Sequence, residues 1–393
     1  MSKGLNVHSE IGKLKKVVLH RPGRDLVNVK AEEFEDVWIH DCFYLDVAQK
    51  EHDAFADLLR SEGVEVLYME KLVAEALDAC PSARAEFTDT FMAESGIVNP
   101  LLEQAVREKL DAISDSYQFV LEAMSVNVKH ITALDMPGIL MVVPNRSPYI
   151  IGMVFENRFI EGHFTISLFP IHMVKQNAFA HGSKRIAREI RARKRLQHQI
   201  IGLNINAHTL AIGISQRTEA AAIEELEKNL FWGSGNSEID TVYAIKIPNG
   251  YAYMHLDTVC TMVDFDKFTV YPGIFETLRV YRLTRGDSEG MVAVQEIDDT
   301  LEHILEMATG VEKVQLIECG AGDMVEASRE QWNDGSNTLA VAPGKVCVYE
   351  RNVVTNDELY KNGLELLVVP SEELSRGRGG PRCMSMPFWR EDI

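Results

Sequence analysis

The first part of the chain changes from an extended to a helical pattern and back again. Residues 14–20 are apolar and β-branched and stop at Arg21-Pro22-Gly23, which predicts a strand followed by a turn. Residues 46–62 place apolar side chains near helical spacing, and Gly63 is suited to end that helix. Residues 64–68 are again extended, so this part predicts the order strand, helix, strand.

The next part of the chain is mainly helical in its pattern. Residues 71–125 are rich in helix formers, with breaks at Pro81, Gly96 and Pro100. Because such a stretch offers few strands of its own, it indicates a helical insertion into an α/β frame.

The alternation of strands and helices returns near residue 206 and continues to residue 369. Extended patterns cover 208–214, 241–247, 251–263, 268–271, 314–317, 338–342, 345–349 and 365–369. Helical patterns cover 219–229, 301–308 and 357–362. A repeated mixed unit of this kind suits similar modules placed around an axis, and the spacing alone equally permits an open, doubly wound sheet.

Composition indicates an ordinary globular protein. The 393 residues are 46% hydrophobic and 25% charged, enough for one large domain or two to three smaller ones. Apolar runs such as 139–143 and 149–155 fall short of the roughly 18–20 residues of a membrane helix. The amino-terminal residues show no apolar signal region, so we expect a cytoplasmic protein without a membrane segment.

Cysteine spacing and net charge narrow the chemistry. Six cysteines lie far apart with no CxxC pair and no HExxH motif, so we expect reduced thiols, no metal site and no cofactor. The formal charge of −19 argues against a nucleic-acid partner and suits a cationic substrate. The basic stretch 184–195 is the exception, and it fits either a solvated helix face or a binding patch.

His255 and Asp257 form the first candidate site. They fall in an extended pattern, where a two-residue period puts both side chains on one face. An imidazole beside a carboxylate can act as a general acid and base, or the carboxylate can bind a cation. A purely structural pair at a strand edge remains the alternative.

Cys383 is the best candidate for a nucleophile. It follows a run of glycine, proline and arginine at residues 375–382, where nearby positive charge favours a thiolate. An incidental small hydrophobic residue and an RNA-binding RGG element are the alternatives, and the net charge argues against the second. We interpret Cys80, Cys260, Cys319 and Cys347 as core residues and 331–337 as a polar turn.

Six segments of the chain together form a recognisable pattern, in order, over about residues 6–124 and 205–393. They read EIGKLKKVVLHRPGRDL, DVAQKEHDAFADLLRSEGVEVLY, LAIGISQRTEAAAIEELEKNLF, MHLDTVCTMVDFDKFTVYP, REQWNDGSNTLAVAPGKVCVYERNVVTN and ELSRGRGGPRCMSMPFWRED. In these segments the chain resembles the arginine deiminases, cytoplasmic microbial enzymes that hydrolyse L-arginine to L-citrulline and ammonia.

The resemblance implies a role for each matching residue. Cys383 would be the nucleophile that forms an amidino-cysteine intermediate, His255 the general acid and base, and Asp257 the carboxylate that holds the guanidinium. Arg217 and Arg378 would bind the substrate carboxylate.

The resemblance also implies a fold and an assembly. Gly377 would belong to the same loop as Arg378. The expected fold is an α/β propeller of five ββαβ modules in a single domain, residues 1–393, with a helical insertion at 71–137. Family members commonly form homo-oligomers.

The chain departs from the family pattern over about residues 125–204. Two further guanidinium-binding acids of the family, in TRDP and EGGD motifs, are not found: Ser147 stands at the first position and His198 near the second. An unpaired guanidinium in a desolvated site costs several kcal/mol, so their loss could abolish turnover.

Three interpretations of this segment stay open: translation out of frame, a diverged pocket with a new ligand, or acids supplied from other positions. The sharp borders and basic composition favour the first. The alternatives to an active deiminase are therefore a catalytically impaired arginine-binding homologue and a related hydrolase acting on another guanidino compound.

Overall fold

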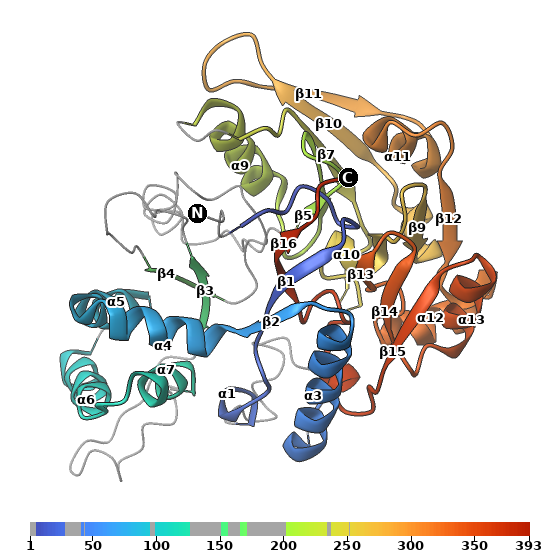
Figure 1. Cartoon of the computed structure of the whole chain (residues 1–393). Coiled ribbons are helices and arrows are strands. Elements are labelled where there is room, and N and C mark those ends of the chain that lie inside the picture. Colours follow the sequence, from blue (N-terminus) through green and yellow to red (C-terminus); the bar gives the residue numbers. More distant parts are fainter. Residues whose placement is uncertain are drawn as a thin grey trace.

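The computed structural model describes residues 5–27, 41–42, 44–94, 99–125, 151–155, 166–170, 202–233, 237–250 and 252–393. It is a mixed α/β structure with several small sheets, and helices α3, α9, α11 and α13 lie toward the outside of the strands (Figure 1). Their bounds are Leu45–Ser61, Ala220–Trp232, Leu301–Thr309 and Val353–Lys361.

Four of the sheets share one connectivity. In each, a middle strand pairs antiparallel with one neighbour and parallel with the other, and a helix joins the two parallel strands. For each sheet we give the antiparallel neighbour, the middle strand and the parallel neighbour, in that order. The first sheet has β16 (Met386–Arg390), β1 (Leu14–Leu19) and β2 (Glu65–Tyr68), and the second has β5 (Gly202–Asn204), β6 (Thr209–Ile214) and β7 (Thr241–Lys246). The third has β8 (Cys260–Met262), β9 (Lys267–Val270) and β12 (Gln315–Glu318), and the fourth has β13 (Leu339–Ala342), β14 (Lys345–Tyr349) and β15 (Glu365–Val369).

Two further strand pairs complete the described sheets. Strands β10 (Val280–Arg285) and β11 (Val292–Ile297) extend the second sheet beyond β7. Strands β3 (Ile151–Phe155) and β4 (Ile166–Pro170) form an antiparallel pair of their own. Parallel strands need a long crossover connection, and each of the four crossovers contains one of the helices α3, α9, α11 and α13.

The two ends of the chain meet in the first sheet. Strand β16, close to the C-terminus, pairs antiparallel with β1 through a register irregularity near Lys16. The amide of Asn6 donates to the carbonyl of Phe388 at 2.8 Å. The first unit is therefore completed by the last strand of the chain.

Helices α4 (Met69–Ala79), α5 (Pro81–Glu94), α6 (Pro100–Asp111) and α7 (Ser116–Ser125) follow β2 and share an apolar core. Pro81 and Pro100 begin helices, because proline suits the first helical turn, where its missing N–H is not needed. Asn99 caps α6 by accepting from the amide of Leu101 at 2.9 Å. A short helix, α1 (Arg24–Val27), precedes them in the chain.

Most sequence-predicted elements are confirmed to within a few residues, including the helix that ends before Gly63, whose φ of +78° is left-handed. The extended assignment of 251–263 is wrong in its first part. Residues Leu256–Val259 form helix α10, and in the described part of this range only Cys260–Met262 form a strand, β8. The sequence reading did not identify β10, β11, β16 or α12 (Met324–Trp332).

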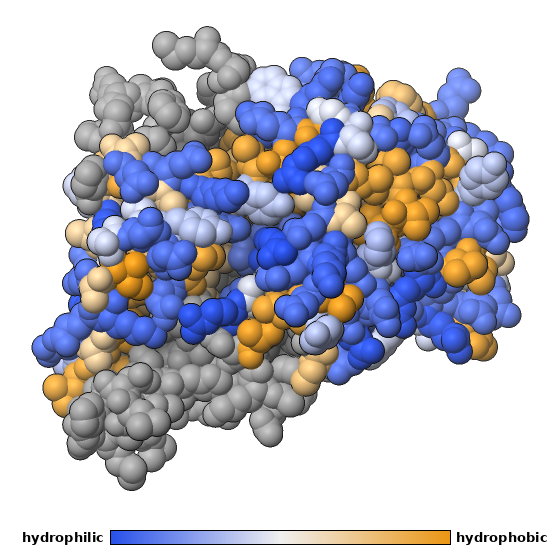
Figure 2. Space-filling view, turned by 60° about the horizontal axis from the view of Figure 1, so that its bottom comes forward, coloured by the Kyte–Doolittle hydropathy of each residue, from blue (hydrophilic) through white to orange (hydrophobic). Residues whose placement is uncertain are grey.

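The described surface is mainly hydrophilic on the face shown in Figure 2, with apolar residues in separate patches. Within the described ranges, no helix is long and apolar enough to cross a membrane. The basic stretch 184–195, the apolar run 139–143, Ser147 and His198 lie outside the described residues.

Candidate active site

The turn that carries His255 and Asp257 is helical rather than extended. His255 is the last extended residue, with φ −138° and ψ 169°, and α10 begins directly after it. The hydroxyl of Thr258 donates to the His255 carbonyl at 2.7 Å and its amide does so at 3.1 Å, which closes the turn. Both side chains are buried, at 3% and 0% exposure, and a helical turn replaces the strand on which the pairing was predicted.

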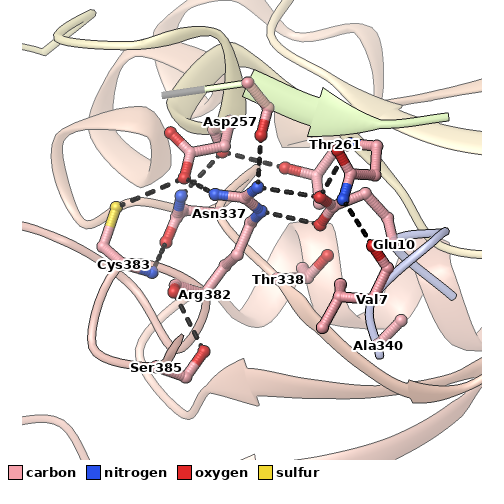
Figure 3. Close-up of polar contacts among 12 residues, drawn as sticks. Val7, Glu10, Asp257, Thr261, Asn337, Thr338, Ala340, Arg382, Cys383 and Ser385 are labelled. Carbon is pink, nitrogen blue, oxygen red and sulfur yellow. Dashed lines mark hydrogen bonds and ion pairs between the residues drawn. The ribbon is translucent and has the colours of Figure 1, made fainter. Parts of the chain in front are cut away.

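Cys383 lies beside this turn although 126 residues separate it from Asp257. Its Sγ is 3.8 Å from Asp257 Oδ2, and its amide donates to Asn337 Oδ1 at 3.0 Å (Figure 3). The thiol is half-buried, unlike the fully buried Cys260 and Cys347. The structure thus brings together two of the predicted residues, a thiol and a carboxylate.

Arg382 is a site residue that sequence reasoning missed. Its guanidinium donates to both carboxylate oxygens of Glu10 at 2.9 Å, to the Gly202 carbonyl at 3.0 Å, and to Asp257 Oδ2 (Figure 3). Glu10 and Arg382 are almost completely buried. The buried arginine therefore joins the amino-terminal segment to the candidate carboxylate.

The charges in this cluster support one another. Burial disfavours the charged form of Arg382, but the negative charges of Glu10, Asp257 and Cys383 outweigh it and raise the pKa of Arg382. Burial likewise opposes ionisation of Glu10, yet the charge and hydrogen bonds of Arg382 lower the pKa of Glu10. The site is thus a fully buried ionic network with a thiol at its edge.

Arg217 lies against the segment that leads into the His255 turn. It is 2% exposed, and its Nη2 lies 3.1 Å from the Sδ of Met254, the residue before His255. The hydroxyl of Ser215 accepts from the Arg217 amide at 3.0 Å and donates to the Met254 carbonyl at 2.8 Å. The loop after β6 is in this way tied to the candidate site.

Arg378 packs against Trp332. Its guanidinium stacks on the ring of Trp332 at 4.0 Å and donates to the Trp332 carbonyl. Burial lowers the pKa of Arg378, and the opposing charge of Asp334 limits that shift. Its φ of +64° is left-handed, a backbone conformation that non-glycine residues rarely adopt.

Gly377 precedes Arg378 as the last residue of the short helix η5 (Leu374–Gly377). The carboxylate of Glu51 on α3 anchors the entry to η5 by accepting from the amides of Glu372, Glu373 and Leu374 at 2.8–3.2 Å. The loop that carries Arg378 and Cys383 therefore starts from a fixed point.

In the part of the chain that the structure describes, no group of three or more His, Cys, Asp or Glu side chains is arranged to hold a metal ion. The described site combines the thiol of Cys383, the carboxylates of Asp257 and Glu10 and the guanidinium of Arg382, and a thiol beside a carboxylate suits the binding and attack of a cationic carbon centre.

Solved structures similar in arrangement include the amidinotransferase SxtG from Microseira wollei, of the saxitoxin biosynthetic pathway. It is 12% identical, with a TM-score of 0.46, and the alignment covers 99% of this chain and 98% of that chain. An inosamine-phosphate amidinotransferase from Streptomyces griseus has the same identity and TM-score, with 99% and 97% coverage.

Sequence relatives are far more similar. An arginine deiminase from Treponema denticola is 43% identical over 407 aligned residues, covering 99% of both chains. One from Clostridium perfringens is 41% identical over 412, covering 100% of this chain and 99% of the relative. The family model for arginine deiminase matches residues 36–139 and 186–390, most of the chain. On this similarity, the chain belongs to the arginine deiminase family.

Proposed function

We propose that the protein hydrolyses L-arginine to L-citrulline and ammonia. The observation that carries the proposal is the 3.8 Å approach of Cys383 Sγ to Asp257 Oδ2 within a buried ionic network. Relatives over 40% identical across nearly the full length are named as arginine deiminases, which supports the same assignment.

The first half of the reaction uses the thiol, the carboxylate and the imidazole. Asp257 binds the guanidinium group of the substrate and holds its central carbon beside Cys383. The thiolate attacks this carbon and forms a C–S bond, and the C–N bond to one terminal nitrogen breaks. His255 gives that nitrogen its proton, so it leaves as ammonia and an amidino-cysteine remains.

The second half uses the same residues in reverse. His255 takes a proton from water, whose oxygen adds to the amidino carbon. The C–S bond then breaks, which returns the thiolate of Cys383 and leaves a ureido group on the product. The substrate carbon keeps its oxidation state throughout, so the residues named here complete the reaction.

Arg217 and Arg378 would bind the α-carboxylate at the other end of the substrate. An arginine fork suits a carboxylate because two parallel N–H groups match its two oxygens. Nε and Nη2 of Arg378 have no hydrogen-bond partner in the described structure, so they are available as donors. Gly377 supplies the loop flexibility that lets Arg378 leave Trp332 and reach the carboxylate.

We also propose that residues 1–393 form one five-module α/β propeller with a helical insertion at 71–137. Four units with ββαβ connectivity are described, and the β3–β4 hairpin would contribute to a fifth. Residues 140–185 lie between the two stretches that match the family model, inside the divergent segment at about 125–204. The acids missing from the family motifs would have to be replaced from outside those motifs.

A trapping experiment tests the chemical proposal. Purified protein is mixed with L-arginine, quenched in acid and digested, and the Cys383 peptide is analysed by mass spectrometry. The proposal predicts an adduct equal in mass to arginine less ammonia, absent from Cys383→Ala. Arginine binding without this adduct or citrulline would instead identify an impaired homologue, and an adduct formed only from another guanidino compound would identify a related hydrolase.

A further inference from the structure

Residues 331–337 are a polar segment to which the proposed reaction assigns no role. This segment nevertheless contacts both Asp257 and Cys383. We propose that Asn337 is the positioning residue that sets Cys383 relative to Asp257. The inference rests on the proposed function, because it takes these two residues as nucleophile and guanidinium ligand.

The side-chain amide of Asn337 bridges the two residues directly. Its Nδ2 donates to the Asp257 carbonyl at 2.7 Å, and its Oδ1 accepts from the Cys383 amide at 3.0 Å (Figure 3). The orientation of the amide is fixed by its partners, because a carbonyl only accepts and a backbone N–H only donates. Asn337 has 0% exposure, so no water competes for either bond.

The loop that carries Cys383 also rests on the backbone of Asn337. A Cβ atom at Gly380 would lie 2.5 Å from the Asn337 carbonyl oxygen and 2.9 Å from Oδ1. Only glycine permits so close an approach, so this loop packs directly on Asn337. Asn337 thus limits the position of Cys383 by contact as well as by hydrogen bonding.

Two neighbours in the segment hold the same parts of the site. Nε2 of Gln331 donates to the Ala252 carbonyl at 3.0 Å and to the Thr258 carbonyl at 2.6 Å, on either side of His255. Asp334 Oδ2 accepts from the Gly379 amide at 2.9 Å, four residues before Cys383. One short segment therefore fixes the His255 turn on one side and the Cys383 loop on the other.

This arrangement predicts where the effect of a substitution falls. Nucleophilic attack needs the sulfur and the carbon at near-contact distance, and a shift of about 1 Å costs roughly 100-fold in rate. Arg217, which we assign to the substrate carboxylate, is positioned by Ser215, whose hydroxyl accepts from the Arg217 amide at 3.0 Å. Loss of the Asn337 amide should therefore lower kcat and leave KM nearly unchanged.

The experiment compares Asn337→Ala and Asn337→Asp with Asn352→Ala. Asn352 is a matched control, because it is 2% exposed and its Nδ2 donates to the Asn333 carbonyl at 3.1 Å. It supports the same segment without contacting Asp257 or Cys383 in the described structure. Asn337→Asp keeps the side-chain shape and the acceptor for Cys383 but lacks the donor to Asp257. Citrulline formation gives kcat and KM, and urea unfolding gives the stability of each variant.

We expect kcat of both Asn337 variants to be about 100-fold lower than that of the unsubstituted chain, and KM to stay within about threefold of its value in that chain. Asn352→Ala should keep kcat within about threefold of the unsubstituted chain, although it should lose about as much stability as the Asn337 variants. If Asn337→Ala does not fold, Asn337→Asp decides by the same criterion. Values of kcat for the Asn337 variants within threefold of Asn352→Ala would overturn the inference. Failure of the proposed function itself is distinct, because the unsubstituted chain would then make no citrulline.

Discussion

The carboxylate of Asp257 shares its buried surroundings with a guanidinium that belongs to the protein. Arg382 contacts both Asp257 and Glu10, and both of these acids are buried at 0% and 4% exposure. A buried charge without a partner is costly, so each member of this network depends on the others. The Asp257 carboxylate, which we assign to the substrate guanidinium, is thus held in place by the guanidinium of Arg382.

This dependence predicts a large effect of Arg382→Met on stability. The methionine keeps much of the length of arginine but leaves Glu10 and Asp257 without their counter-charge. We expect a loss of about 3–5 kcal/mol in the free energy of unfolding in urea. As the control, Arg60→Met removes an exposed ion pair with Asp57 and should cost under about 1 kcal/mol. Equal stability of the two variants would contradict the assigned network.

The residues of the candidate site were predictable to different degrees. Cys383, His255 and Asp257 stand in long motifs, so the sequence alone singles them out. Arg382 stands next to Cys383, but its role depends on Glu10, 372 residues away, and no local pattern indicates that contact. The signal that could have found Arg382 is its place in the sequence, directly between Pro381 and the candidate nucleophile Cys383.

At the scale of elements, β1 is joined to the helices that follow it through His20. Nδ1 of His20 lies 3.0 Å from a carboxylate oxygen of Glu70 on α4, and Nε2 lies 3.3 Å from Asp25 on α1. Burial disfavours the charged imidazole, but the hydrogen bonds to Asp25 and Glu70 outweigh it and raise the pKa of His20 to about 9.

The raised pKa predicts a stability that depends on pH. The contribution of His20 is fully present below its ordinary pKa of 6.5 and is lost as the pH rises through about 9. At about 1.4 kcal/mol per pKa unit it amounts to at most about 3.5 kcal/mol. Urea unfolding across this window should therefore show a loss in the wild type that His20→Gln lacks. If the stability of the two proteins changed with pH in the same way, His20 would not be paired with Asp25 and Glu70.

Sequence patterns predict the elements well where burial follows one helix face, as in α3, or where a short apolar run is buried along most of its length, as in β14. They fail at 252–259, where aromatic and β-branched residues favour a strand. There the Thr258 hydroxyl caps the His255 carbonyl and Gln331 binds the Ala252 and Thr258 carbonyls, so tertiary contacts impose a helical turn. Strand β16 was missed because it contains Pro387, and proline argues against a strand in a sequence pattern.

At the scale of the whole molecule, the fold closes by pairing its last strand with its first. Arg390, at the end of β16, is 1% exposed, and its Nη1 donates to the carbonyls of Gly12 and Ala340 at 2.8 Å. These two residues belong to the first and last described units. Residues near the C-terminus therefore hold together parts that are distant in the sequence.

Removal of residues 386–393 should accordingly abolish the cooperative thermal transition. The deletion leaves β1 with an open edge and removes the side chain that links Gly12 to Ala340. Removal of residues 392–393 alone deletes exposed side chains and the surface contacts of Asp392 with Asn6 and His8, and it should leave a cooperative transition. Differential scanning calorimetry distinguishes the two, and a normal transition in the longer deletion would refute this account of closure.

Citrulline formation from L-arginine by the purified 393-residue chain, beside Cys383→Ser, tests the central claim most directly. We expect the wild type to produce citrulline and ammonia in equal amounts. Cys383→Ser should produce neither while unfolding at the same urea concentration, because the half-buried thiol contributes little to the core. No citrulline from the wild type, or unchanged turnover in Cys383→Ser, would contradict the account.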